Sequence, residues 1–319
     1  MPTIPSLRGP VDVNDLGVTM LHEGLCFTTK PAYQQKAMDY QIRLLRRAAD
    51  VGMTTLAIFW PWLDIPKCLK ATEGFPQMHF LMSTGTFLRP MTPPAVRDLA
   101  EDDLVRRFVK ELSKGYDGFE SQGIRPFLIR LGSNDGNLSD WEKKTFRAAA
   151  RAQREMGGQV PIGLHSCAGA REQMQYLAEH GANIAKTFYA HIEAEFGWEG
   201  RGPEQEADYL EEVLKAGGSL VFNNFDFEFD TPWPDMVYLI NELDRRGYSR
   251  QILLTIDVNW EFDEDGNIWH EQQKNHPETG KRGYAYMITH AVPMLMAEGV
   301  SLQRINRYLI ENPRRILGG

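Results

Sequence analysis

Cysteine is scarce in this sequence of 319 residues, which contains only Cys26, Cys68 and Cys167, none of them in Cys-x-x-Cys spacing. This pattern argues against a disulfide framework and against a thiolate zinc site, and it fits a reducing compartment. The sequence also lacks any run of about 18 apolar residues, and no basic segment followed by an apolar run opens it. We therefore expect a soluble, cytoplasmic protein without a signal peptide or membrane span.

Positive charge is also in short supply. Lys and Arg number 35 against 43 Asp and Glu, the formal net charge is −8, and no long block of basic residues occurs. Nucleic acids and anionic membrane surfaces are recognised through such blocks, so neither is an expected partner. We expect a small-molecule substrate, while the question of a homodimer stays open.

The hydrophobic pattern alternates between short apolar runs and longer segments with helical periodicity, which is typical of repeated βα units. Eight strands are predicted, at residues 17–21, 54–59, 79–84, 125–131, 160–165, 184–191, 219–224 and 251–257. The intervening segments carry helix signals, including a capping box that begins at Ser139 and opens a helix over 141–156. No linker divides the chain. The sequence therefore predicts an α/β fold, a single (β/α)₈ TIM barrel over residues 1–319 with long loops after strands six and eight.

Polar residues fall at the ends of several predicted strands. In a (β/α)₈ barrel the carboxyl ends of the strands form the active-site face. His22, His165, His191 and Asp257 close strands one, five, six and eight, and Arg130 lies in strand four. Imidazoles and a carboxylate that converge on one mouth are a plausible site for zinc, manganese or iron.

Several segments, taken in order, resemble the phosphotriesterase-like branch of the amidohydrolase superfamily. These segments extend over nearly the whole chain and are Arg8-Gly9-Pro10, Leu16 to Glu23, Ser83 to Phe87, Gly123 to Arg130, Ala148 to Ala152, Pro161 to His165, Gln251 to Asp257 and Glu311 to Arg315. The resemblance implies a metal-dependent barrel hydrolase. One metal would lie on a His-x-His pair and the strand-eight aspartate. The other would lie on the strand-five and strand-six histidines, with a carboxylated strand-four lysine and a hydroxide between them.

Two positions depart from that pattern. His22, His165, His191 and Asp257 match, but the second histidine of His-x-His is Gly24, and the lysine position holds Arg130. A guanidinium stays protonated and does not form a stable carbamate, and its fixed charge repels a pair of metal ions. The two-metal centre is therefore not expected to assemble.

Three functional hypotheses follow from this departure. The first is hydrolysis of an ester, lactone or amide by water activated on one divalent metal, zinc being favoured over manganese or iron, with His22, His165, His191 and Asp257 as ligands. In it Asp257 is a ligand or the general base, and Arg130 pairs with Asp257 or binds a substrate anion. The second is a metal-free lyase, isomerase or decarboxylase in which Arg130 clamps an anionic metabolite. The third is a non-catalytic barrel that binds a small molecule.

Tryptophans in the loops suggest the wall of a substrate site. The predicted substrate-binding residues follow strands two and eight or end strand seven, and they are Trp60, Trp62, Asn224, Trp260 and Trp269. Aromatic rings at a barrel mouth are suited to an apolar part of a ligand, although for any single tryptophan the packing of a loop against the barrel is the more common role. His270 and His276 lie in the long loop after strand eight, and the sequence assigns them no role.

Overall fold

The computed structural model describes residues 3–194, 198–225, 231–263, 265–270 and 280–318. Two parallel sheets contain all eight predicted strands. The first has the order β3-β4-β5 and the second the order β11-β10-β9-β8-β7-β6. The bounds are β3 Val18–Glu23, β4 Met53–Ile58, β5 His79–Leu81, β6 Ser83–Gly85, β7 Leu128–Gly132, β8 Ile162–His165, β9 Thr187–Ala190, β10 Ser219–Phe222 and β11 Ile252–Leu254. The predicted third strand is therefore interrupted at Met82.

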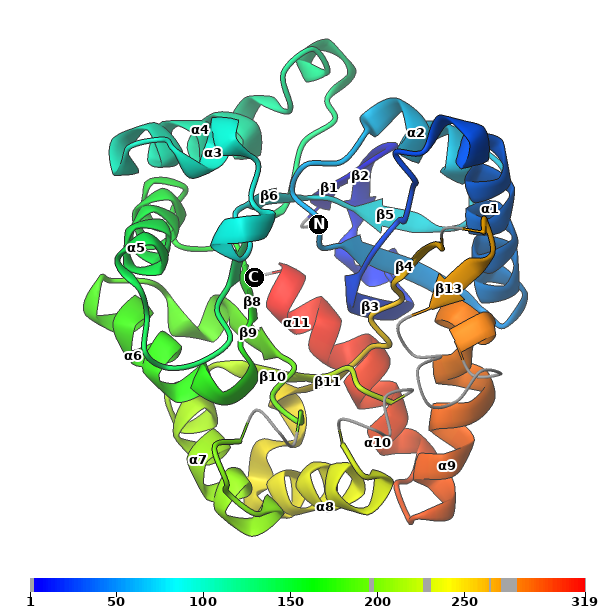
Figure 1. The fold of residues 1–319 in the computed structure, drawn as a ribbon. Helices are drawn as coiled ribbons and strands as arrows, with labels where there is room; N and C mark the ends of the chain where they lie inside the picture. Colours follow the sequence, from blue (N-terminus) through cyan, green and yellow to red (C-terminus); the bar gives the residue numbers. More distant parts are fainter. Residues whose placement is uncertain (1–2, 195–197, 226–230, 264, 271–279, 319) are drawn as a thin grey trace.

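The two sheets curve into one barrel. Met82 joins β5 directly to β6, and β11 lies against β3, where the Thr255 hydroxyl donates to the carbonyl oxygen of His22 at 3.3 Å. The helices surround the strands in an outer ring (Figure 1). The protein is a (β/α)₈ barrel, as the alternating hydrophobic pattern predicts.

The α-helices occur where the sequence carries apolar stripes. Their bounds are α1 Gln34–Asp50, α2 Ile65–Thr72, α3 Pro94–Arg97, α4 Glu101–Lys114, α5 Asp140–Glu155, α6 Ala170–Glu179, α7 Pro203–Lys215, α8 Trp233–Leu243, α9 Val292–Ala297, α10 Leu302–Asn306 and α11 Asn312–Gly318. The capping box predicted at Ser139 is present, because its side chain and that of Glu142 each bind the other's backbone amide. No described helix is both long enough and apolar enough to span a bilayer.

Two antiparallel ribbons supplement the barrel. β1 (Thr3–Ser6) pairs with β2 (Gly9–Asp12) before the first barrel strand, and β12 (Trp260–Phe262) pairs with β13 (Ile268–His270) in the loop after β11. The first three residues of the predicted strand six, Ile184–Lys186, form a 3₁₀ turn instead of a strand. Lys186 within it donates to the carbonyl oxygen of Ile316 at 3.0 Å, away from the histidines.

Hydrophobic side chains fill both the layer between strands and helices and the inside of the barrel. The inner cluster combines strand residues such as Leu128 and Phe188 with Ile316 and Leu317 of α11. In Figure 1, α11 lies across the middle of the ring of strands. Because α11 contacts the segments that precede β3 and β9, it covers the end where the strands begin. The opposite end, where the strands finish, is left for polar side chains.

Candidate functional site

Three histidines from three strands converge at the carboxyl end of the barrel. His22 belongs to β3, His165 closes β8, and His191 follows β9 directly. One ring nitrogen from each lies within 4.8 Å of those from the other two. The ring centroids of His165 and His191 are 4.2 Å apart, and those of His22 and His191 are 5.0 Å apart. Asp257 adds a carboxylate, with Oδ2 3.2 Å from His191 Nε2 and Oδ1 3.8 Å from His22 Nε2.

Burial keeps two of these imidazoles neutral. It lowers the pKa of His22 well below its usual value, and the neighbouring His191, Arg130 and His165 lower it further. The pKa of His165 is also lowered well below its usual value, first by burial and then by His191 and Arg130. A neutral imidazole has a free lone pair, which is the form that binds a metal ion.

The residues fit a single divalent ion. A tetrahedral zinc site with Zn–N distances of about 2.1 Å places its ligand nitrogens about 3.4 Å apart, so small side-chain movements bring the three imidazoles into range. His22 Nδ1 is buried and has no hydrogen-bond partner. The donor set of three imidazoles and one carboxylate suits zinc, and it also suits manganese or iron.

The backbone around two site residues is unusual. His191 and Asp257 have φ angles of 62° and 58°, the left-handed region that non-glycine residues seldom adopt. Each is held by a neighbouring side chain. The His191 amide donates to Asn223 Oδ1 at 2.7 Å, and the Asp257 amide donates to Glu23 Oε1 at 3.3 Å. These contacts aim both side chains at the common centre.

Glu23 fastens the end of β11 to β3. Its Oε1 accepts the Ile256 amide at 2.9 Å, and its Oε2 accepts the Val258 amide at 3.0 Å. Burial raises the pKa of Glu23 to about 7, and the hydrogen bonds from Thr255 and from these two amides oppose that shift. Side chains alternate along a strand, so Glu23 is directed away from the face on which the neighbouring His22 lies. In the structure it positions the turn that carries Asp257.

Arg130 occupies a cage of aromatic rings beside the histidines. Its guanidinium carbon lies 3.8 Å from the ring centre of Phe87, 4.6 Å from that of Trp60 and 4.7 Å from that of Phe59. Its Nη1 donates to the carbonyl oxygen of Phe59 at 2.9 Å. Burial lowers its pKa to about 9, so it remains charged at neutral pH, and nearby Asp257 favours that charge.

The space beside Gly24 is filled by Trp60. A Cβ atom at Gly24 would lie 3.3 Å from the carbonyl oxygen of Val258 and 3.4 Å from Trp60 Nε1. A larger side chain at this position therefore requires the indole to move. The same indole also lies against the guanidinium of Arg130. Trp60 therefore contacts both residues, Gly24 and Arg130, that depart from the family pattern.

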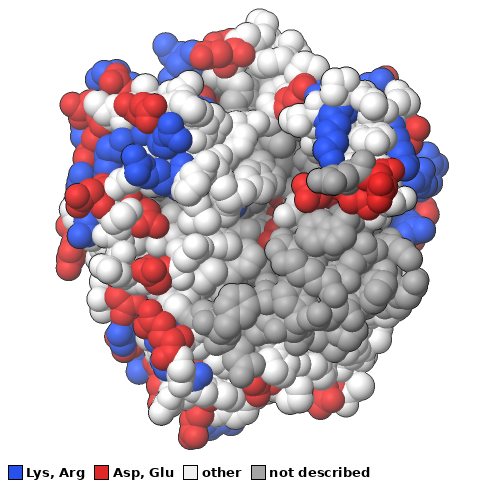
Figure 2. Space-filling model, viewed as in Figure 1, with Lys and Arg blue, Asp and Glu red and all other residues white. Residues whose placement is uncertain are grey.

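A cavity of about 580 Å³ opens above these groups. Its lining includes all five strand-end residues predicted from the sequence, together with Trp60 and Asn224. Asn224 Nδ2 is buried without a hydrogen-bond partner. Figure 2 shows this face of the molecule; on the left of the central hollow the described surface is largely uncharged, and the charged side chains of that side lie towards the outer edge.

The other predicted tryptophans lie elsewhere. Trp62 and Trp260 line an adjoining cavity of about 690 Å³, which shares Trp60 and Asn259 with the first. The side chains of Trp269 and His270, and all of His276, lie outside the part of the chain that the structure describes. The sequence reasoning missed Phe59, Phe87 and Cys167. Each lies within two residues of a strand end, which is the signal that could have found them.

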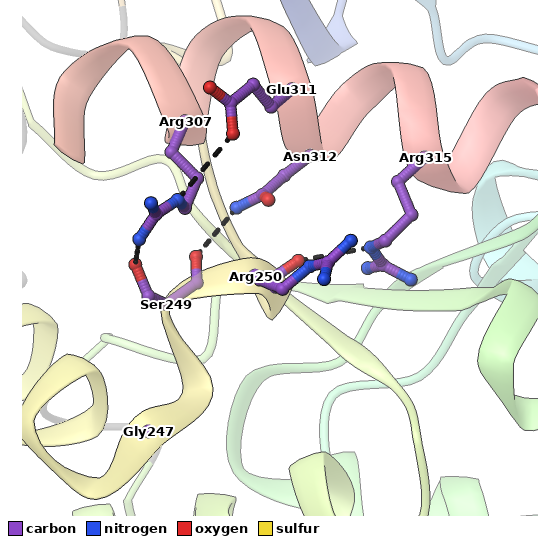
Figure 3. Close-up of a pocket in the computed structure, with 7 residues that line it drawn as sticks. All are labelled: Gly247, Ser249, Arg250, Arg307, Glu311, Asn312 and Arg315. Atoms are coloured by element: carbon purple, nitrogen blue, oxygen red, sulfur yellow. Dashed lines mark hydrogen bonds and ion pairs between the residues drawn. The ribbon is translucent and has the colours of Figure 1, made fainter. Parts of the chain in front are cut away.

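A third cavity, of about 520 Å³, lies between α11 and the segment that precedes β11 (Figure 3). Arg307 Nη1 donates to Ser249 Oγ at 2.9 Å, and Arg315 Nε donates to the carbonyl oxygen of Arg250 at 3.1 Å. This cavity is at the end where β11 begins, and its lining contains neither histidine nor cysteine. It does not have the ligands for a metal centre, unlike the cavity at the barrel mouth.

Comparison with known proteins agrees with this architecture. A sequence model of the phosphotriesterase family matches residues 68–317, more than half of the chain. The phosphotriesterase homology protein of Mycobacterium tuberculosis is 23% identical over 99% of this chain and 98% of its own length. The N-acetyltaurine hydrolase of Salmo salar is 27% identical over 98% of this chain and 97% of its own. The phospho-furanose lactonase of Mycoplasmopsis synoviae is 26% identical over 98% of this chain and 90% of its own. The barrel, its strand-end histidines and the family match lead to one conclusion: this chain belongs to the phosphotriesterase family.

Proposed function

We propose that the protein hydrolyses an ester, lactone or amide bond of a small molecule with the help of one divalent metal ion. The observation that carries this proposal is the convergence of His22, His165 and His191, whose ligand atoms lie within 4.8 Å of one another. Relatives named as an N-acetyltaurine hydrolase and a phospho-furanose lactonase support hydrolysis of an amide or a lactone. When bound, the ion polarises the scissile carbonyl and lowers the pKa of a water molecule.

The chain's own residues account for binding and proton transfer. The three histidines and Asp257 would hold the ion. Asp257 Oδ2 lies 3.2 Å from His191 Nε2, within the same group of ligand atoms, so this carboxylate would be placed to take a proton from the attacking water and pass it to the leaving group. Asn224 Nδ2 offers an unused donor to a substrate oxygen.

The adjoining cavity would receive the remainder of the substrate. Trp62, Leu63 and Trp260 give it aromatic and aliphatic walls, and Trp60 separates it from the histidines. A substrate whose scissile bond lies at the histidines therefore has room for an apolar group on the far side of Trp60.

The metal content tests the proposal first. Protein purified without chelator or affinity nickel is expected to contain about one zinc, manganese or iron per chain by elemental analysis. His165→Ala and His191→Ala should lower this content, whereas the control His180→Ala, at a half-buried histidine directly after α6, should not. Near-zero content that does not rise after incubation with divalent metals would overturn the proposal.

Activity measurements then separate the two roles of Asp257. Asp257→Asn is expected to lower turnover about 10²–10⁴-fold on any ester, lactone or amide that the wild type hydrolyses. If the metal content of this variant equals that of the wild type, Asp257 acts in proton transfer. If the metal is lost with the activity, Asp257 acts as a ligand.

A further inference from the structure

Arg130 is a buried cation without a carboxylate partner among the described residues. Its side chain is only 3% exposed. Nη1 donates to a neutral carbonyl, Nε is buried with no partner, and within the described ranges no acidic oxygen lies within 4 Å of the guanidinium. Buried arginines are normally paired, because an uncompensated charge in a protein interior is costly. The unused hydrogen-bonding capacity therefore requires explanation.

The aromatic cage determines where a partner can approach. The guanidinium carbon lies within 5 Å of the ring centres of Phe59, Trp60 and Phe87, so these rings surround part of the group and make cation–π contacts with it. The carbonyl oxygen of Phe59 accepts a hydrogen bond from Nη1. Among the described residues no hydrogen bond is found for Nε or Nη2, and paired N–H groups on one edge of a guanidinium match the two oxygens of a carboxylate, sulfonate or phosphate.

A second hydrogen-bond donor lies in the same cavity as Arg130. Arg130 lines the cavity together with His22, His165 and Asn224. Asn224 contributes an N–H donor, because its Nδ2 is buried without a hydrogen-bond partner. Asp257 lines the same cavity and favours the charge of Arg130, but no ion pair within 4 Å joins these two described residues.

We propose that Arg130 binds an oxyanion group of the ligand, a carboxylate, sulfonate or phosphate, through its Nε–Nη2 edge. For the substrate class this inference rests on the proposed function: the hydrolysed ester, lactone or amide carries an anionic group on the same small molecule. The binding itself does not depend on hydrolysis or on a metal.

The test is calorimetric titration of chelator-treated protein with small anions. Acetate, methanesulfonate and inorganic phosphate are the probes, acetamide is the neutral control, and chloride keeps the ionic strength constant. At least one anion is expected to bind while acetamide does not. Arg130→Met should weaken that binding by about tenfold or more, which is the usual contribution of charge-assisted hydrogen bonds. Arg130→Lys should give an intermediate loss of affinity, because lysine keeps the charge but lacks the paired N–H groups of the guanidinium.

A matched control is Arg106→Gln, an exposed arginine on α4 that pairs with Asp103 and lies outside the cavity. It should leave anion binding unchanged. If Arg130→Met does not fold, Trp60 provides a second measurement, since its indole stacks on the guanidinium. Anion binding should then alter tryptophan fluorescence in the wild type, and Trp60→Phe should remove most of that change.

Two results would overturn the inference: no anion binds the wild type at tens of millimolar, or Arg130→Met binds as the wild type does. Neither coincides with failure of the hydrolase proposal. Absence of metal with intact, Arg130-dependent anion binding would reject metal-dependent hydrolysis and leave the anion site in place. A stoichiometric metal without anion binding would do the reverse.

Discussion

The backbone amide of Asp257 donates to the carboxylate of Glu23 across 3.3 Å, although 234 residues separate the two in the chain. Glu23 also accepts the amides on either side of Asp257, so it holds the left-handed turn in which Asp257 sits. Glu23, at the end of β3, thus fixes the direction of the Asp257 carboxylate, which follows β11.

Glu23→Gln is expected to disturb that turn. One of the two oxygens becomes an NH₂ group that faces a backbone N–H, so a hydrogen bond is replaced by repulsion. We expect a loss of roughly 1–3 kcal/mol in the free energy of unfolding and a lower kcat at an unchanged pH. Urea unfolding and turnover assays measure the two effects. Glu111→Gln, at a buried glutamate that binds Thr84 and Arg107, should lower stability without lowering kcat per folded molecule.

Gly24→His alone should not create a second metal site. The new side chain would meet Trp60 and the carbonyl of Val258, so we expect a destabilisation of roughly 1–3 kcal/mol from overpacking and an unchanged metal content. The triple variant Gly24→His, Trp60→Ala, Arg130→Lys should instead raise the content towards two ions per chain. Gly74→His, where a side chain meets open space, is the stability control. A second ion in the single variant would contradict this account.

Asn223→Ala is expected to weaken metal binding without removing a ligand. The Asn223 side chain accepts the His191 amide at 2.7 Å, and its Nδ2 lies 3.1 Å from His191 Nδ1, so it orients the ring. Loss of such an orienting group typically lowers metal affinity about 10–100-fold. Titration of metal-depleted protein measures this affinity. Asn183→Ala, whose amide binds the carbonyl oxygen of Gly158, should leave it unaltered, and equal effects of both variants would point to general destabilisation.

Glu206 should make stability depend on pH away from the site. Burial raises its pKa to about 7 although Arg201 binds its Oε2 at 2.6 Å. A carboxyl whose pKa is higher in the folded than in the unfolded state contributes stability below the unfolded value, near 4.5, and this contribution is lost as pH rises through about 7. The unfolding free energy of the wild type relative to Glu206→Gln should therefore fall between pH 5 and pH 8. A constant difference across that range would refute the assignment.

The barrel fold and the residues at the carboxyl ends of its strands could be predicted from the sequence, because the sequence shows where each strand ends. Alternating apolar runs locate eight strands, and a parallel barrel brings all their carboxyl ends to one face. His22, Arg130, His165, His191 and Asp257 consequently line one cavity in the structure. Their roles in metal binding and catalysis stay predictions.

The contacts that shape the site could not be predicted in the same way. The cage of Phe59, Trp60 and Phe87 depends on side-chain directions in the segments that follow two different strands, β4 and β6. The Glu23 contact crosses the seam between the first and last strands, where no local pattern signals a partner. Trp60, Trp62 and Trp260 all lie in segments that follow barrel strands. Of these three, only Trp60 lines the cavity that contains the histidines.

The contact of Trp60 with both Gly24 and Arg130 also limits how this site can change over evolutionary time. A histidine at position 24 meets the indole, and a lysine at position 130 forfeits the stacking that three rings provide. A chain with only one of these two substitutions is therefore expected to be less stable than a chain with the present residues or with both substitutions. Conversion between this centre and a two-metal centre requires correlated substitutions, so descendants of this chain are expected to retain or lose glycine, tryptophan and arginine at these positions as a group.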